Sequence, residues 1–90
     1  MRARLLALAL ALVAAGAHAV EANSASRAQL EQLRHVGPPL ADAILVAREQ
    51  GGSFKDWSDL MQRVRGIGAA KAVKLSQAGL TVNGQGYAPR

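Results

Sequence analysis

Two stretches of this sequence, 31 residues apart, decide its fold: LRHVGPPL at residues 33–40 and VRGIGAAK at residues 64–71. A shift of 31 residues pairs residues of the same kind in the same order: Leu33 with Val64, Arg34 with Arg65, Val36 with Ile67 and Gly37 with Gly68. Glycine and proline end a helix at such a bend and allow a second helix to begin after it. The chain beyond residue 19 is therefore predicted to be two copies of one helix, bend and helix unit. Neither copy can cover its own apolar face alone.

The segments around the two bends have the marks of four helices. Apolar residues at helical spacing, with breaks at glycine and proline, place these helices over residues 27–34, 38–51, 57–64 and 69–77. Ser26 with Gln29 has the spacing of a capping box, and Asp56 with Asp59 repeats it. Phe54, the only phenylalanine, is expected to fill the core between the two halves. The expected fold class is all-α, a compact four-to-five-helix domain.

The N-terminus has the three parts of a secretory signal peptide: a basic start, the apolar run LLALALALVAA at residues 5–15, and an A-x-A arrangement that ends at Ala19. Cleavage is expected after Ala19. An uncleaved membrane anchor is the alternative, but a spanning helix needs roughly 20 apolar residues and this run is shorter. No cysteine follows the run, which excludes a lipid-modified cysteine anchor. We expect a periplasmic or secreted protein without a stable membrane anchor.

Three parts of the chain are predicted: a signal peptide at residues 1–19, one domain at residues 20–82 and a tail at residues 83–90. The tail, NGQGYAPR, has no period and little to bury, so it is expected to be disordered. Without any cysteine, the domain must be stabilised by packing alone, even in an oxidising compartment.

The charge of the chain is moderately basic. Removing Arg2 and Arg4 from eleven basic residues leaves nine, against six acidic ones, so the mature formal charge is +3. Such an excess suits a polyanion such as nucleic acid, but it is also common on proteins without that partner.

Four groups of residues around the bends carry a family resemblance: Ser26-x-x-Gln29-Leu30, Val36-Gly37-Pro38, Gly52-x-Phe54 and Val64-Arg65-Gly66-Ile67-Gly68-x-x-Lys71. Together they resemble the ComEA-type tandem helix-hairpin-helix DNA-binding family over roughly residues 20–82. The resemblance implies two helix-hairpin-helix motifs in an exported protein that binds incoming double-stranded DNA during natural transformation. The implied partners are DNA and, beyond it, envelope DNA-transport or pilus components. No cofactor is expected.

The second bend has the chemistry of a phosphate site. Glycines at positions 66 and 68 let the backbone take positive φ angles and approach a ligand without side chains in the way. With the free amides that open the next helix they form a concave anion site, and the helix dipole favours a phosphate there. The alternative is a plain turn between helices, with Ile67 simply part of the core.

Basic residues gather around this second bend, at Arg63, Arg65, Lys71 and Lys74, and no acidic residue follows Asp59. The repeat and this clustering favour phosphate contact over a plain turn. The residues predicted to bind DNA are Arg65, Gly66, Ile67, Gly68, Ala69, Ala70, Lys71, Lys74, Val36 and Gly37.

The first bend departs from the family pattern. His35 replaces the first glycine, Leu40 stands where the second unit has Lys71, and Pro38-Pro39 provides no amide donors. The amides of His35 and Gly37 remain able to reach a phosphate. His35 either contacts DNA when protonated below pH ~6.5 or is an exposed loop histidine without function. A metal site is not expected, because the mature chain has one histidine and no cysteine.

Three further side chains each allow two interpretations. Arg34 and Arg48 either touch phosphates beside the first bend or are solvated helix ends. Trp57 either covers the edge of a small core or offers a stacking platform to an unpaired base.

The function predicted from the sequence is sequence-independent binding of double-stranded DNA by an exported protein. The alternative is a structural module that uses the same fold to dock on a protein partner, which the altered first bend suggests. An enzyme is the least expected class, because residues 20–90 contain no convergent acid, base or metal cluster.

Overall fold

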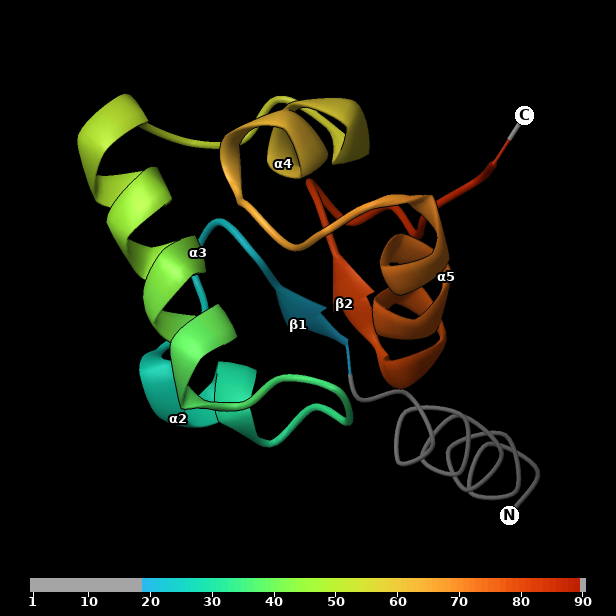
Figure 1. The fold of residues 1–90 in the computed structure, drawn as a ribbon, viewed down its shortest axis with the longest axis horizontal. Helices are drawn as coiled ribbons and strands as arrows, with labels where there is room; N and C mark the ends of the chain where they lie inside the picture. The colour runs from blue at the N-terminus through green and yellow to red at the C-terminus, as the bar shows by residue number, and fades with distance from the viewer. Residues whose placement is uncertain (1–18, 90) are drawn as a thin grey trace, which may run out of the picture.

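The computed structural model describes residues 19–89, which form four helices and a two-stranded parallel sheet (Figure 1). In chain order the elements are β1 (Val20–Glu21), α2 (Arg27–Glu31), α3 (Pro38–Gly51), α4 (Trp57–Arg63), α5 (Ala69–Ala78) and β2 (Leu80–Thr81). The fold is mostly helical, as expected, with both helical pairs where the sequence places them. The predicted signal peptide, apart from Ala19, lies outside the described residues. Within residues 19–89, no helix is long and apolar enough to cross a membrane.

Side-chain caps set the starts of α2 and α4. Ser26 Oγ accepts a hydrogen bond from the Gln29 amide at 3.1 Å, and Gln29 Oε1 accepts one from the Ser26 amide at 2.9 Å. This is the capping box that the sequence predicts. Asp56 accepts from the Asp59 amide at 2.8 Å, also as predicted. The Asp59 carboxylate, however, accepts from the Lys55 amide instead of completing a box with Asp56.

Glycines with positive φ follow the ends of α3 and α5. Gly52 has a φ of 79° and Gly79 a φ of 116°, so both occupy the region that favours glycine. α2 differs from its prediction, because it ends at Glu31 and not near residue 34. The chain already turns at Gln32, and this turn carries Leu33 into the core.

Both repeats contribute to one hydrophobic core. Its buried members are Ala22, Ala25, Leu30, Leu33, Val36, Ala41, Ile44, Phe54, Trp57, Leu60, Val64, Ile67, Ala72, Leu75, Leu80 and Val82. Phe54 is fully buried, as its place between the halves predicts. Trp57 covers the core edge, and its indole N–H donates to the Gln85 carbonyl at 2.8 Å. Of its two interpretations, the structural one is therefore confirmed.

The parallel pairing of β1 with β2 is not predicted by the sequence. Val20 lies opposite Leu80 and Glu21 opposite Thr81, which joins the first and last parts of the domain (Figure 1). Two residues per strand are too few to show an alternating pattern. The sheet therefore adds an N-terminal and a C-terminal segment to a fold that the sequence describes only by its helices.

Residues 83–89, where the sequence predicts a disordered tail, make specific contacts in the structure. Val82 and Gln85 exchange two backbone hydrogen bonds of 3.0 and 3.1 Å around a turn. The Tyr87 amide donates to Ser76 Oγ at 2.8 Å, and its ring lies 5.5 Å from that of Trp57. The Trp57 ring gives Tyr87 an apolar surface to pack on, and its indole N–H donates to the Gln85 carbonyl, so contacts with α4 hold this short segment in place.

Candidate nucleic-acid interface

The two bends, hairpin one (residues 32–37) and hairpin two (residues 64–68), have the same backbone conformation. His35 has a φ of 71° and Gly66 a φ of 100°, whereas both Gly37 and Gly68 are extended. The Val36 amide donates to Leu33 O at 3.2 Å, and Ile67 repeats this bond at 3.4 Å in hairpin two. The 31-residue repeat read from the sequence is thus also a repeat of geometry.

Hairpin two presents its glycines outward and its isoleucine inward. Ile67 is 3% exposed, whereas Gly66 and Gly68 are exposed on either side of it. Only Gly66 has the positive φ predicted for both glycines. Gly68 has a φ of −94° and a ψ of −173°, which any residue can adopt, because it is the extended residue before α5.

The first turn of α5 offers a set of main-chain donors. Within residues 19–89, no hydrogen bond occupies the amides of Gly68, Ala69, Ala70 or Lys71. A Cβ atom built on Gly68 would have no neighbour within 4 Å, so the space beside the Gly68 Cα atom is open. Helix N-termini of this kind bind anions, because the amides point outward and the helix dipole adds positive potential.

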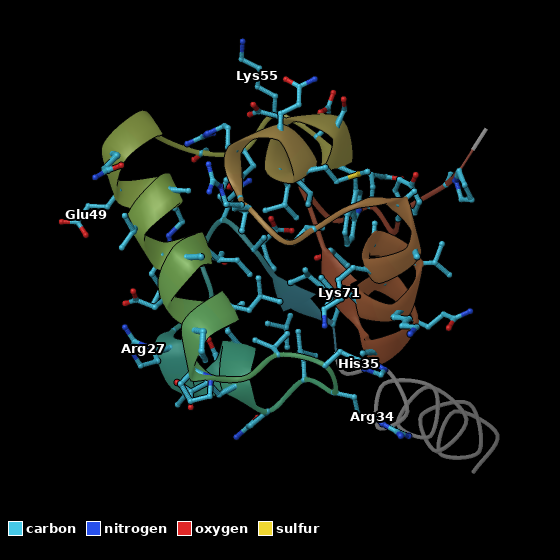
Figure 2. All side chains as sticks on the ribbon, viewed as in Figure 1. Arg27, Arg34, His35, Glu49, Lys55 and Lys71 are labelled. Atoms are coloured by element: carbon cyan, nitrogen blue, oxygen red, sulfur yellow. The ribbon has the colours of Figure 1, made fainter. Side chains whose placement is uncertain are left out.

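Three cations in and after hairpin two have no acidic partner among residues 19–89. Arg65 and Lys74 are exposed and Lys71 is half-buried. The ion pairs among residues 19–89 join Arg27 to Glu31 and Asp42, and Arg63 to Asp59. Figure 2 draws Lys71 in the same part of the molecule as Arg34 and His35 of hairpin one. Lys55 projects from the opposite end of the view (Figure 2).

Arg63 is not part of this charged surface, although the sequence groups it there. Its guanidinium donates to Ala47 O at 2.7 Å and to Gly52 O at 2.8 Å, at the end of α3. It also pairs with Asp59 at 3.1 Å and stacks 4.5 Å from the Phe54 ring centroid. These contacts make Arg63 a residue that holds α4 against the end of α3.

Hairpin one has the same shape but fewer donors. Val36 is 5% exposed and packs in the core, whereas Gly37 and His35 are exposed. Pro38 and Pro39 occupy the first two positions of α3, and proline has no backbone N–H group. Hairpin one therefore lacks the two donors that Ala69 and Ala70 provide in hairpin two. Leu40 packs against the core where Lys71 carries a charge in the second repeat. The expected loss of phosphate donors at hairpin one is therefore present in the structure.

The interpretation of Arg48 as a solvated helix end is wrong. Its guanidinium is half-buried and donates to Ala22 O at 2.9 Å and to Ala25 O at 3.0 Å. Arg48 thus ties the segment before α2 to α3. Arg34 is exposed and makes no ion pair or side-chain hydrogen bond among residues 19–89, so both of its interpretations remain open.

The groups that hairpin two exposes are main-chain amides and cations. In residues 19–89 there is no group of three or more His, Cys, Asp or Glu side chains that could hold a metal ion. What this part of the chain provides is a row of unoccupied amides from Gly68 to Lys71, together with the exposed side chains of Arg65 and Lys74. Such a surface suits phosphate oxygens.

The comparisons with known proteins agree with this geometry. A family model described as a helix-hairpin-helix motif matches residues 16–78, which is well over half of the chain. Searches of curated proteins and of solved structures gave no match. Helix-hairpin-helix motifs commonly bind DNA. With its two glycine bends, four helices and this match, the chain belongs to the helix-hairpin-helix family.

Proposed function

We propose that the protein binds double-stranded DNA through its phosphates, mainly at hairpin two. The observation that carries the proposal is the row of unoccupied amides from Gly68 to Lys71, in a segment whose cations have no acidic partner among residues 19–89. Hairpin one, with the same backbone and fewer donors, adds weaker contacts through Gly37 and Arg34. Membership in the helix-hairpin-helix family supports nucleic acid as the ligand.

Binding of this kind is independent of base sequence. Main-chain amides and cations that contact phosphate oxygens position the DNA without reading base edges. Affinity then depends strongly on salt, by about 0.9 log unit per phosphate neutralised for each log unit of salt. We expect a slope that corresponds to about three to five phosphates. Binding is the whole of the proposed activity, and turnover of a lesion-containing duplex would contradict it.

Two lysines provide the sharpest test of this surface. Lys71→Ala removes a cation beside the amides of α5, whereas Lys55→Ala removes an exposed cation from the other end of the molecule (Figure 2). In a mobility-shift assay with random-sequence duplex, Lys71→Ala should weaken binding several-fold and lower the salt slope by about 1. Lys55→Ala should leave both nearly unchanged. Absence of a shift by the unaltered protein at tens of micromolar would end the proposal.

We further propose export and a role in DNA uptake during natural transformation, as the resemblance to ComEA-type proteins suggests. The support is the signal-peptide pattern of residues 1–19, which precedes the domain directly. Cell fractionation should place the protein in the periplasm or the medium. Deletion of its gene should lower transformation by added duplex DNA without changing growth. Adjacent genes for pili or DNA transport would support the same role.

Docking on a protein partner is the second candidate function. A groove of about 550 Å³ runs between α3 and the start of hairpin two, and Val46, 41% exposed, lies in its wall. A protein partner that stays bound after nuclease treatment would favour docking over DNA capture. Val46→Glu should then release this partner, whereas Gly66→Val should leave it bound.

A further inference from the structure

The peptide bond between Ala19 and Val20 lies at the start of the fold. Val20 is the first residue of β1, and its N–H donates to the Gly79 carbonyl at 2.8 Å. Two residues later, the Ala22 amide donates to Thr81 O at 2.9 Å, and the Ala22 side chain is fully buried. The chain is therefore held by main-chain contacts from the first residue after this bond.

The group that accepts from Val20 lies at the C-terminal end of α5. Gly79 caps this helix with a φ of 116°, and its own amide donates to Leu75 O and Ser76 O. A helix C-terminus has partial negative charge, which basic side chains in the last turn usually offset. The last turn of α5 has no basic residue. The last turn of α5 thus has no basic side chain of its own, and the Val20 nitrogen lies within hydrogen-bond distance of the Gly79 carbonyl oxygen at this end.

We propose that hydrolysis of the Ala19–Val20 bond is a maturation step that supplies this cation. The inference rests on the signal-peptide part of the proposed function. In net terms, a signal peptidase adds the hydroxyl of water to the Ala19 carbonyl carbon and the remaining proton of that water to the Val20 nitrogen as the peptide bond breaks. The new carboxylic acid then gives its proton to the Val20 amine. The products are a carboxylate on Ala19 and an ammonium on Val20. The ammonium takes the place of the Val20 amide, beside Gly79 O at the negative end of α5.

The same contacts fix the order of events. A protease that cuts here must hold the chain around Ala19 as an extended strand of its own. In the folded protein the Val20 amide is already bonded and Ala22 is buried, so this segment is not free to leave β2. Cleavage therefore precedes the pairing of β1 with β2, and pairing then retains the new amino terminus.

The charge of the new Val20 amino group can be tested by changing the pH, because the side chains around it are mostly uncharged. Side chains from α2, hairpin one and α5 that line the space around Ala19 and Val20 are neutral: Gln29, Gln32, Leu33 and Ala78. The Glu21 carboxylate faces the amides of the Asn83-Gly84 turn. The other charged or titratable groups on these elements are Arg27, Glu31, Arg34, His35, Lys71 and Lys74. An α-amino group ordinarily has a pKa of about 8, so its charge changes between pH 6 and pH 10.

The first experiment compares the mature chain beginning at Val20 with the same chain acetylated on its Val20 nitrogen. Residues 20–90 contain the whole described core, so both chains have the complete fold. The folded protein favours the ammonium, which raises its pKa above that of the unfolded chain. The stabilisation is then complete below about pH 8 and is lost as pH rises through the folded pKa. At pH 6 the free amine should raise Tm by about 2–6 °C, and this gap should close by pH 10. A gap that is absent, or equal at both pH values, overturns the proposed contact.

The second experiment tests cleavage on the full chain. Mass spectrometry of the exported protein should give an N-terminus at Val20. Folded full-length protein should resist purified signal peptidase, whereas Leu80→Asp, which places a charge at a fully buried position of β2, should be cut. Equal cutting of both chains, or an N-terminus elsewhere, overturns the ordered maturation. A mobility shift on the same samples reports DNA binding separately, so either proposal can fail without the other.

Discussion

At the scale of single residues, Gly66 and Gly68 have different reasons to be glycine. Gly66 has a φ of 100°, which costs an L-residue roughly 1–2 kcal/mol, so glycine avoids a cost that His35, with a φ of 71°, carries in hairpin one. Gly68 has an extended backbone and open space where a Cβ would stand, so the fold alone would accept another residue. Because serine or aspartate at this position would cap α5, glycine there sacrifices helix stability. The proposed DNA phosphate, which would approach the amides closely, is our explanation for that choice.

This interpretation predicts opposite effects of Gly68→Asp on stability and on binding. The carboxylate should cap α5 and raise the free energy of unfolding by about 0.5 kcal/mol. It should also occupy the amides and repel phosphate, so DNA affinity should fall at least tenfold. Urea unfolding and fluorescence anisotropy with labelled duplex measure the two quantities. Gly68→Ala adds bulk without charge, so its DNA affinity should lie between those of the unaltered protein and Gly68→Asp. Its free energy of unfolding should fall below that of the unaltered protein, because alanine is a poorer N-cap than glycine. Unchanged affinity in Gly68→Asp would show that DNA binds elsewhere.

At the scale of elements, α3 and α5 begin with the same bend and differ in what their first turns present. Gly68 and the three residues after it carry four amides, whereas Pro38 and Pro39 leave α3 with only those of Gly37 and Leu40. The fixed φ of proline at the helix start favours the helix. Hairpin one therefore keeps the backbone of the repeat but has two main-chain donors fewer than hairpin two.

Restoring the missing groups should make hairpin one a stronger contact. Pro39→Ala returns an amide, and Leu40→Lys places an ammonium where the second repeat has Lys71. The lysine stem can still cover part of the core surface that Leu40 covers. The double variant should bind duplex several-fold more tightly, with a salt slope larger by about 1. Gln50→Lys adds the same charge at the other end of α3. An equal gain from Gln50→Lys would mean that net charge, and not hairpin one, sets the affinity.

The sequence predicts the helices and bends well because their signals are local. Capping residues such as Ser26 and Asp56 lie beside the amides they bind, and a 31-residue repeat marks both hairpins. The β1–β2 pair depends on residues at opposite ends of the domain, and strands this short have no period to recognise. Arg63 likewise looks like its basic neighbours in the sequence. Only the fold shows that its guanidinium bonds to the end of α3.

At the scale of the whole molecule, one carboxylate connects both ends of the domain. Glu21 accepts hydrogen bonds from the amides of Asn23, Asn83 and Gly84 at 2.8–3.1 Å, and from the Thr81 hydroxyl at 2.9 Å. The Asn23 side chain continues the connection to both main-chain groups of Phe54, in the linker between the repeats. The Asn83-Gly84 pair is a turn signal in the sequence, but nothing in the sequence indicates that Glu21 binds it.

This connection should make stability depend on pH in the acid range. Burial by itself would raise the pKa of Glu21, but its hydrogen bonds to Gly84, Asn83 and Asn23 outweigh burial and lower it below the ordinary 4.5. A lowered folded-state pKa gives stability that is complete above about pH 4.5 and is lost as pH falls through the folded value. Glu21→Gln should lower the free energy of unfolding at pH 7 by about 1 kcal/mol, since solvent screens a partly exposed carboxylate.

The gap between Glu21→Gln and the unaltered protein should shrink between pH 4.5 and pH 3, as urea unfolding across that range would measure. Glu49→Gln removes an exposed carboxylate from α3 and should leave the pH dependence unchanged. A gap for Glu21→Gln that is as large at pH 3 as at pH 7 would show that the Glu21 charge does not hold the termini together. Because hairpin two lies outside this network, DNA affinity of the folded Glu21→Gln protein at pH 7 should match that of the unaltered chain.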